Sequence, residues 1–154
     1  MGFTDIDTAA MRLAIAASRD ARERGNMPFG ATLLSPAGET LWVAQNNQVT
    51  TGDCTGHAEV ALVREAVAAL GALALRGATV YASGEPCAMC SGAMFWAGIR
   101  RIVFAIPTVD MAGPLGGPQL PPRCAEVLAH AVPAVQVEGP LLREEGLAEL
   151  RLPG

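Results

Sequence analysis

The chain has 154 residues, a length typical of one domain, and we expect a single domain over residues 1–154. Hydrophobic residues make up 51% of the chain and charged residues only 17%, which excludes a chain that is disordered throughout. The formal net charge is −4 and no lysine is present. This balance disfavours nucleic acid as the main partner, because proteins that bind its phosphates usually carry a basic stripe.

The sequence carries no sign of export or membrane insertion. No apolar stretch reaches the roughly 20 uninterrupted residues of a membrane span. Residues 1–7 contain acids where a secretory signal has positive charges and an apolar block. We therefore expect a cytoplasmic protein without a membrane partner. Its four cysteines are then more typical of a metal-binding or catalytic protein than of a disulfide framework.

The first half of the chain predicts a helix followed by a β-hairpin. Apolar residues at helical spacing indicate a helix over residues 5–24, and Gly25 follows as a natural C-cap. Two runs of β-forming residues, 29–35 and 40–49, are joined by the Pro-Ala-Gly-Glu turn at 36–39. These features predict that the fold opens with one helix and an antiparallel strand pair.

Helices and strands then alternate, which predicts an α/β fold with a mixed sheet whose second half is largely parallel. Residues 111–122 contain two Gly-Pro steps and one Pro-Pro step, so an irregular loop is expected there. Because loops after the strands of such sheets border the ligand crevice, this loop is a candidate pocket wall. The alternating elements are expected at 58–70 (helix), 78–82 (strand), 87–97 (helix), 101–106 (strand), 123–131 (helix), 134–137 (strand) and 142–150 (helix).

Two short motifs, His57-Ala58-Glu59 and Pro86-Cys87-Ala88-Met89-Cys90, predict a zinc site. Residues three apart share one face of a helix, so Cys87 and Cys90 can direct both sulfurs to one ion. Pro86 fits a helix start, where its missing N–H would have no partner anyway. With His57 as third ligand, the fourth tetrahedral position of Zn²⁺ stays open for water, as in catalytic zinc sites.

Alternatives to an open zinc site are a closed structural site that recruits Cys54 and a redox-active C-x-x-C pair. Cys124 and His130 are expected to be structural, and Arg101, just before a strand, to be a solvated charge. In the open site Glu59 is not a ligand but takes a proton from water and passes it on. Because Glu59 is only two residues from His57, this requires His57 to lie at the boundary between loop and helix.

These residues resemble the cytidine deaminase-like superfamily of zinc deaminases, which carry the H-x-E and P-C-x-x-C signature. The similarity covers roughly the first hundred residues and is strongest towards guanine deaminases and tRNA adenosine deaminases. It implies a three-layer α/β/α fold with a five-stranded mixed sheet, and hydrolytic removal of an exocyclic amine from a nucleobase. The resemblance is carried by residues 27–31, Asn46, 55–59, 81–94 and 101–104.

The resemblance also implies how the substrate is bound. Asn46, eleven residues before His57, occupies the place where these enzymes hydrogen-bond the base, and Ala58 offers a backbone contact. Phe29 and Trp96 are candidate aromatic walls of the base pocket, although each also suits an ordinary packing role. Asp110, at the start of the Gly/Pro-rich loop, is a candidate proton relay or specificity carboxylate, or else a solvated acid.

The sequence therefore predicts a zinc-dependent hydrolytic deaminase of a free nucleobase or related amino-heterocycle, most simply a purine such as guanine. A tRNA adenosine deaminase is the first alternative, and it would show tRNA affinity that falls steeply with salt. A non-catalytic, zinc-stabilised interaction protein is the second. The high apolar fraction of so small a chain, and the dimers common among such deaminases, predict a homodimer.

Overall fold

The structure, a computed structural model, describes residues 2–152, which contain one five-stranded mixed sheet. Its strands are β1 (Gly30–Leu34), β2 (Thr40–Gln45), β3 (Thr79–Gly84), β4 (Arg101–Ile106) and β5 (Gln136–Glu138). They lie in the order β2-β1-β3-β4-β5. β1 is antiparallel to β2 and β3, whereas β4 is parallel to β3 and β5. The mixed sheet with a parallel second half is confirmed.

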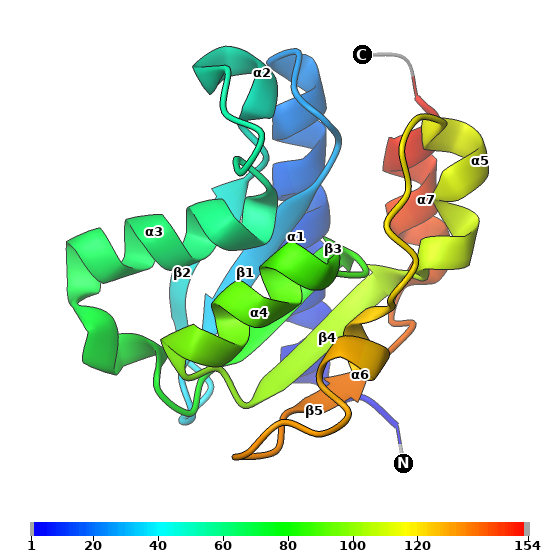
Figure 1. Cartoon of the computed structure of the whole chain (residues 1–154). Helices are drawn as coiled ribbons and strands as arrows, with labels where there is room; N and C mark the ends of the chain where they lie inside the picture. The colour runs from blue at the N-terminus through cyan, green and yellow to red at the C-terminus, as the bar shows by residue number, and fades with distance from the viewer. Residues whose placement is uncertain (1, 153–154) are drawn as a thin grey trace.

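Helices cover both faces of this sheet and complete the three-layer arrangement (Figure 1). The longer ones are α1 (Asp5–Glu23), α3 (Ala58–Leu70), α4 (Ala88–Ala97) and α7 (Arg143–Arg151), and the single turns are α2 (Gln48–Thr51), α5 (Ala112–Leu115) and α6 (Cys124–Val127). Short 3₁₀ turns lie at Ala72–Leu75 and Thr108–Asp110. None of the helices within residues 2–152 is long and apolar enough to cross a lipid bilayer.

The central strands are apolar on both sides, as expected for strands covered by helices on both faces. Val80 of β3 and Ile102 of β4 are buried in the core that includes α3 and α4. The next residues along the two strands, Tyr81 and Val103, are buried in the core that includes α1 and α7. The alternation places α3 and α4, with their N-terminal ends, on one side of the sheet.

Glycines and a capping box set the ends of the longer helices. Thr4 caps α1, since its hydroxyl accepts from the Asp7 backbone N–H while the Asp7 carboxylate accepts from the Thr4 N–H. Gly25 follows α1 at φ +83°, in the left-handed region, as expected for a residue just past a helix end. Gly98 ends α4 in the same way at φ +97°.

Several predicted boundaries were wrong, mostly in the last third. The predicted second strand over 40–49 ends at Gln45, and residues 48–51 form α2 instead. The helix predicted over 123–131 is reduced to α6, and the chain continues as turns in which the Ala131 N–H donates to the Leu128 carbonyl. The last strand lies at 136–138 rather than 134–137, and the loop predicted over 111–122 contains the single turn α5.

Candidate active site

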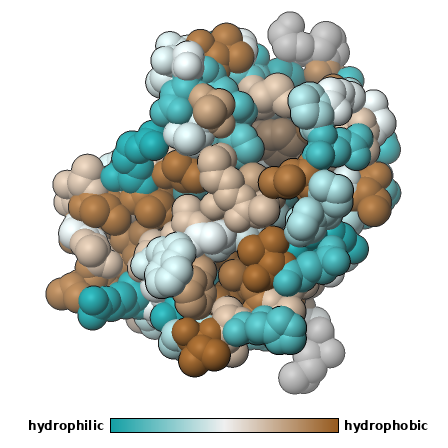
Figure 2. Space-filling view, viewed as in Figure 1, coloured by the Kyte–Doolittle hydropathy of each residue, from teal (hydrophilic) through white to brown (hydrophobic). Residues whose placement is uncertain are grey.

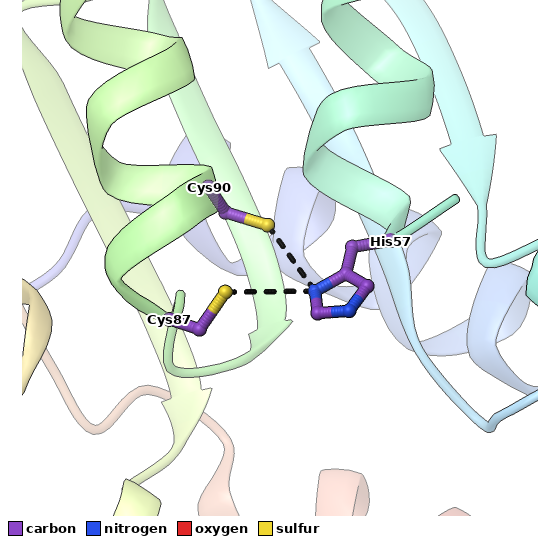
Figure 3. A group of neighbouring side chains, drawn as sticks. All are labelled: His57, Cys87 and Cys90. Carbon is purple, nitrogen blue, oxygen red and sulfur yellow. Dashed lines mark hydrogen bonds between the residues drawn. The ribbon is translucent and has the colours of Figure 1, made fainter. Parts of the chain in front are cut away.

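Three side chains converge where the N-terminal ends of α3 and α4 lie side by side (Figure 3). His57 is the N-cap residue of α3, Cys87 is the N-cap residue of α4, and Cys90 lies in the first turn of α4. The Nδ1 atom of His57 is 3.5 Å from the sulfur of Cys87 and 3.4 Å from that of Cys90. All three candidate ligand atoms lie within 4.8 Å of one another.

The local sequence explains this convergence. Gly56, just before His57, has no room for a side chain, because a Cβ there would lie 2.3 Å from the Oδ1 atom of Asn47. The tight turn leaves His57 in an extended conformation at the boundary between loop and helix, as predicted. Pro86 immediately precedes the N-cap residue Cys87, so α4 begins one residue later than predicted.

The donor set and its spacing fit Zn²⁺. Ligands at about 2.05 Å for nitrogen and about 2.3 Å for sulfur, at tetrahedral angles, would be separated by about 3.5 Å. The observed nitrogen–sulfur separations are 3.4 and 3.5 Å. Two sulfurs and one imidazole are also ligands that zinc favours. His57, Cys87 and Cys90 therefore form a site suited to zinc.

The closed-site alternative finds no support in the described residues. The group that could hold a metal ion consists of His57, Cys87 and Cys90, and the exposed Cys54 lies outside it. Cys124 is buried and His130 is exposed, and neither belongs to the group. Within residues 2–152 three protein ligands thus leave one tetrahedral position for a non-protein ligand, as in catalytic zinc sites.

Glu59 lies beside this group and is almost completely shielded from solvent. It lies in the first turn of α3, is 6% exposed and lines the pocket together with His57 and Cys87. Burial, and then the negative charge at Cys87, raises the pKa of Glu59 to about 7. A carboxyl group that titrates near neutral pH can both accept and donate a proton.

The two cysteines differ in their ease of ionisation. The hydrogen bond from Cys90 is the main cause that lowers the pKa of the Cys87 thiol to about 4, and His57 adds to the lowering. The same hydrogen bond, together with burial, raises the pKa of Cys90 far above its usual range. Cys87 thus reaches the thiolate form that metal ligation requires, and a bound cation would stabilise the second thiolate.

A pocket of about 710 Å³ opens beside the group. Three predicted substrate-binding residues, Phe29, Asn46 and Ala58, line it together with Glu59. The loop predicted as a pocket wall also lines it, through residues between Met111 and Arg123. The space beside Phe29 is tight, because a Cβ on Gly84 would lie 2.6 Å from the Phe29 ring. Most of the remaining lining is apolar, which suits the face of a flat heterocycle.

Trp96 does not lie in this pocket, and its prediction as a pocket wall was wrong. The residue is near the C-terminal end of α4, is 84% exposed, and lines a separate hollow with Phe95, Arg100 and Val132. Nine residues at about 100° each place Trp96 on the opposite side of the helix from Cys87. Its ring packs edge-on against Phe95 at a centroid distance of 4.9 Å.

Asp110 is also absent from the pocket lining, which contains its neighbours Val109 and Met111. Its carboxylate accepts a 2.8 Å hydrogen bond from Nε of Arg143 at the start of α7. This ion pair lowers the pKa of Asp110. The geometry therefore corrects the prediction of a proton relay or specificity carboxylate, because the group is occupied by a structural partner.

Sequence reasoning missed Gln48 as a pocket residue. Its Oε1 accepts a 2.7 Å hydrogen bond from Nδ2 of Asn46, and its backbone N–H donates to Asn46 Oδ1 at 3.0 Å. Both side chains line the pocket. The Asn-x-Gln spacing in a turn was the signal that could have pointed to it, since an Asn side chain commonly accepts from the N–H two residues on.

Two curated relatives are similar in sequence to more than half of this chain. The chain is 34% identical over 149 residues to a probable cytosine deaminase of Schizosaccharomyces pombe, a match that covers 94% of this chain and 90% of the relative. It is 41% identical over 85 residues to a guanine deaminase of Bacillus subtilis, which covers 55% of this chain and 54% of the relative. The chain thus spans about half the length of the second relative.

Two solved structures share the architecture. A structure from work on tRNA:A34 deaminases superposes with a TM-score of 0.72 at 31% identity, covering 92% of this chain and 99% of the other. The protein NE0047 in complex with 2,6-diaminopurine superposes with a TM-score of 0.81 at 24% identity, covering 94% of this chain and 79% of the other. Both likenesses confirm the three-layer fold expected from the sequence.

The sequence pattern of one family matches residues 4–106, which include the three ligands and Glu59. That family is described as the cytidine and deoxycytidylate deaminase zinc-binding region. The match spans well over half of the chain, and it coincides with the residues that the structure brings together. The chain belongs to the cytidine and deoxycytidylate deaminase zinc-binding family and is a zinc-binding deaminase of that family.

Proposed function

We propose that this protein hydrolytically deaminates a free nucleobase or a related amino-heterocycle, with a purine such as guanine as the substrate. The observation that carries the proposal is the position of Glu59. It is a buried carboxyl group with a pKa raised to about 7, next to a three-ligand zinc site and facing an apolar pocket. The relative named guanine deaminase supports the choice of a purine.

The mechanism assigns a separate task to each side chain. His57, Cys87 and Cys90 would hold Zn²⁺, which when bound supplies a Lewis acid that makes water easier to deprotonate. The Glu59 carboxylate accepts the proton of the attacking water and delivers it to the ring nitrogen beside the amine-bearing carbon. It then carries the remaining proton of that water from the new ring hydroxyl to the amine, which leaves as ammonia while the oxygen of the water remains on the ring.

The charge around the pocket favours a neutral base over a nucleotide or tRNA. Among the described residues that line the pocket, the permanently charged cation is Arg123, and its guanidinium is already bound by Glu85. A phosphate would therefore find no free positive charge in this lining, and the chain as a whole is acidic. The neutral amides of Asn46 and Gln48 suit the hydrogen-bonding edge of a base.

Cytosine is the second candidate substrate. The relative named probable cytosine deaminase matches 94% of this chain, whereas the match to the guanine deaminase covers 55% of it. A pyrimidine such as cytosine has the same amidine group as a purine, so Glu59 would transfer the same protons in both reactions. The two substrates therefore differ in how they fill the pocket rather than in chemistry.

We also propose a homodimer. Apolar side chains gather over the outer end of α3 and the adjoining turn, on the left of Figure 2, where Leu70 and Leu73 are exposed. Trp96 and Val132 are exposed around the hollow at the end of α4. Light scattering should give about twice the 15.9 kDa mass of one chain, and a species of a single chain's mass would contradict it. The cytoplasmic location stays a prediction.

An ammonia-release screen tests the proposed function. The zinc-loaded protein is incubated with guanine, adenine, cytosine, their nucleosides and amino-triazines, in parallel with Glu59→Gln. We expect guanine to be turned over by the wild-type protein and not by the variant. Turnover of cytosine alone would move the assignment to the second candidate. Stoichiometric zinc without ammonia release from any compound would instead support the non-catalytic alternative.

A further inference from the structure

One side of the pocket is formed by a surface segment that begins near Asp110, which Arg143 binds. Pocket-lining residues of this segment include Leu115, Leu120 and Pro122, yet no residue from 111 to 123 is buried. Its α5 hydrogen bonds are local, from Leu115 N to Met111 O and from Gly116 N to Ala112 O. Met111 and Leu115 are partly buried against the core that includes α1 and α7, so apolar burial contributes less here than in a fully buried segment.

Both ends of this segment meet at one carboxylate, that of Glu85. Before the segment, Thr108 donates to Glu85 Oε1 from its backbone N–H at 2.8 Å and from its hydroxyl at 3.0 Å. After the segment, Arg123 donates to the same oxygen from Nη2 at 2.9 Å, and its Nε lies 3.2 Å from both carboxylate oxygens. Glu85 therefore closes the base of the loop between Thr108 and Arg123.

The surroundings of the Glu85–Arg123 ion pair oppose its separation. The side chain of Glu85 is 1% exposed and that of Arg123 is 42% exposed. Without Arg123 the buried carboxylate would keep the two Thr108 donors and lose its cation, which is unfavourable for a buried charge. Arg123 is fixed on its other side, since it is the N-cap residue of α6 and its backbone N–H donates to Glu126 Oε1 at 2.9 Å. Cys124, the next residue, is fully buried. The ion pair thus joins the residue after β3 to the N-cap residue of α6.

Glu85 also links the loop to the metal site, because it lies two residues before Cys87 and lines the pocket. We propose that Arg123 is a positioning residue whose ion pair with Glu85 holds residues 109–122 as the pocket wall that encloses the substrate. The inference rests on the proposed deaminase function of the same pocket. Arg123 touches neither the reacting atoms nor Glu59 in this account, so it acts on substrate binding rather than on proton transfer.

Amide hydrogen exchange tests the structural part of the proposal without a substrate. The zinc-loaded wild-type chain is compared with Arg123→Met, which keeps the length of the side chain and removes its charge. Arg12→Met is the matched control, because Arg12 of α1 forms an exposed ion pair with Glu145 of α7 and neither residue lines the pocket. Exchange at Leu115 and Gly116 should be about tenfold faster in Arg123→Met alone. Equal exchange in all three proteins would overturn the proposal.

Kinetics test the functional part, with the substrate that the ammonia screen identifies. Arg123→Met should raise KM about tenfold and leave kcat within about twofold, as expected for the loss of charge-assisted hydrogen bonds that position a binding wall. Arg123→Lys keeps the charge without the paired donors and should give an intermediate KM. A fall in kcat at unchanged KM, or no change in either constant, would overturn the proposal.

The two experiments separate this proposal from the proposed function. If the wild-type protein releases no ammonia from any compound, the deaminase proposal fails, while the exchange comparison still decides whether Arg123 holds the segment. Zinc content is measured in every variant and should stay at one ion per chain, because Arg123 is not a ligand. Loss of zinc from Arg123→Met would contradict a role confined to the pocket wall.

Discussion

Gln48 forms hydrogen bonds with both the oxygen and the nitrogen of the Asn46 side-chain amide. Its backbone N–H donates to Asn46 Oδ1 at 3.0 Å, and its own Oε1 accepts from Asn46 Nδ2 at 2.7 Å. Asn46 is buried, so the two hydrogen bonds leave its amide one orientation in the pocket. The donor and the acceptor of this amide are thus already aligned, as the proposed contact with a substrate requires.

Removal of the Gln48 side chain should weaken substrate binding. In Gln48→Leu the Nδ2 donor of Asn46 loses its partner, and one lost hydrogen bond of about 1 kcal/mol corresponds to a KM about fivefold higher. The effect on kcat should be small, because Glu59 is unchanged. Val49→Ala is the control, since its neighbouring side chain is 66% exposed and outside the pocket. Steady-state kinetics with equal KM for all three proteins would rule out this role.

Loss of a ligand cysteine should abolish zinc binding, and loss of a bystander cysteine should not. We expect Cys87→Ala and Cys90→Ala to lower zinc affinity more than about 100-fold, since even indirect changes at zinc sites cost 10–100-fold. Cys54→Ala should retain one zinc ion per chain, because Cys54 lies outside the ligand group. Chelator treatment should remove activity, and added zinc should restore it. Zinc loss from Cys54→Ala, measured by atomic absorption, would revive the closed-site alternative.

A buried network around Asp7 predicts how stability changes with pH. The Asp7 carboxylate accepts from Nη1 of Arg101 at 2.8 Å and from the Tyr81 hydroxyl at 2.6 Å. The Arg101 hydrogen bond is the main cause that holds the pKa of Asp7 well below its usual range. The stabilisation is therefore complete above the unfolded pKa, about 3.9, and is lost as the pH falls towards the folded pKa.

Asp7→Asn should lower the free energy of unfolding by about 2 to 3 kcal/mol at pH 7, because Arg101 loses its buried partner. The difference from the wild type should shrink below about pH 4, where Asp7 of the unfolded wild-type chain begins to take up a proton while the folded form stays ionised. Asp5→Asn, an exposed acid of the same helix turn, should cost less than about 1 kcal/mol. Urea denaturation at pH 7, 5 and 3 measures this, and a pH-independent difference would refute the assignment.

The residues that local geometry determines were predictable from the sequence. The short spacing of Cys87 and Cys90 and the turn before His57 lie within single segments, so helix geometry was enough to bring the ligands to two helix starts. The alternation of strands and helices predicted the sheet for the same reason. Even the error at Trp96 could have been avoided with helix geometry, since its angular position places it on the opposite side of α4 from Cys87.

Apart from Gln48, whose partner Asn46 is two residues away, the residues that were missed depend on partners far away in the chain. Asp110 is bound by Arg143, 33 positions later. Arg101, expected to be solvated, donates to Asp7, 94 positions earlier, and also pairs with Glu138. Charge and periodicity in a single segment carry no information about such pairs, because they arise only when the sheet brings the segments together. The Glu85–Arg123 pair was missed for the same reason.

The most direct test of the account is Glu59→Gln. The account predicts that this variant keeps one zinc ion per chain, since Glu59 is not among the ligands, and that its kcat falls by about 10² to 10⁴, the usual contribution of general acid–base catalysis. Zinc content and ammonia release are measured on the same preparation. A zinc-loaded Glu59→Gln protein that releases ammonia at the wild-type rate would contradict the central claim.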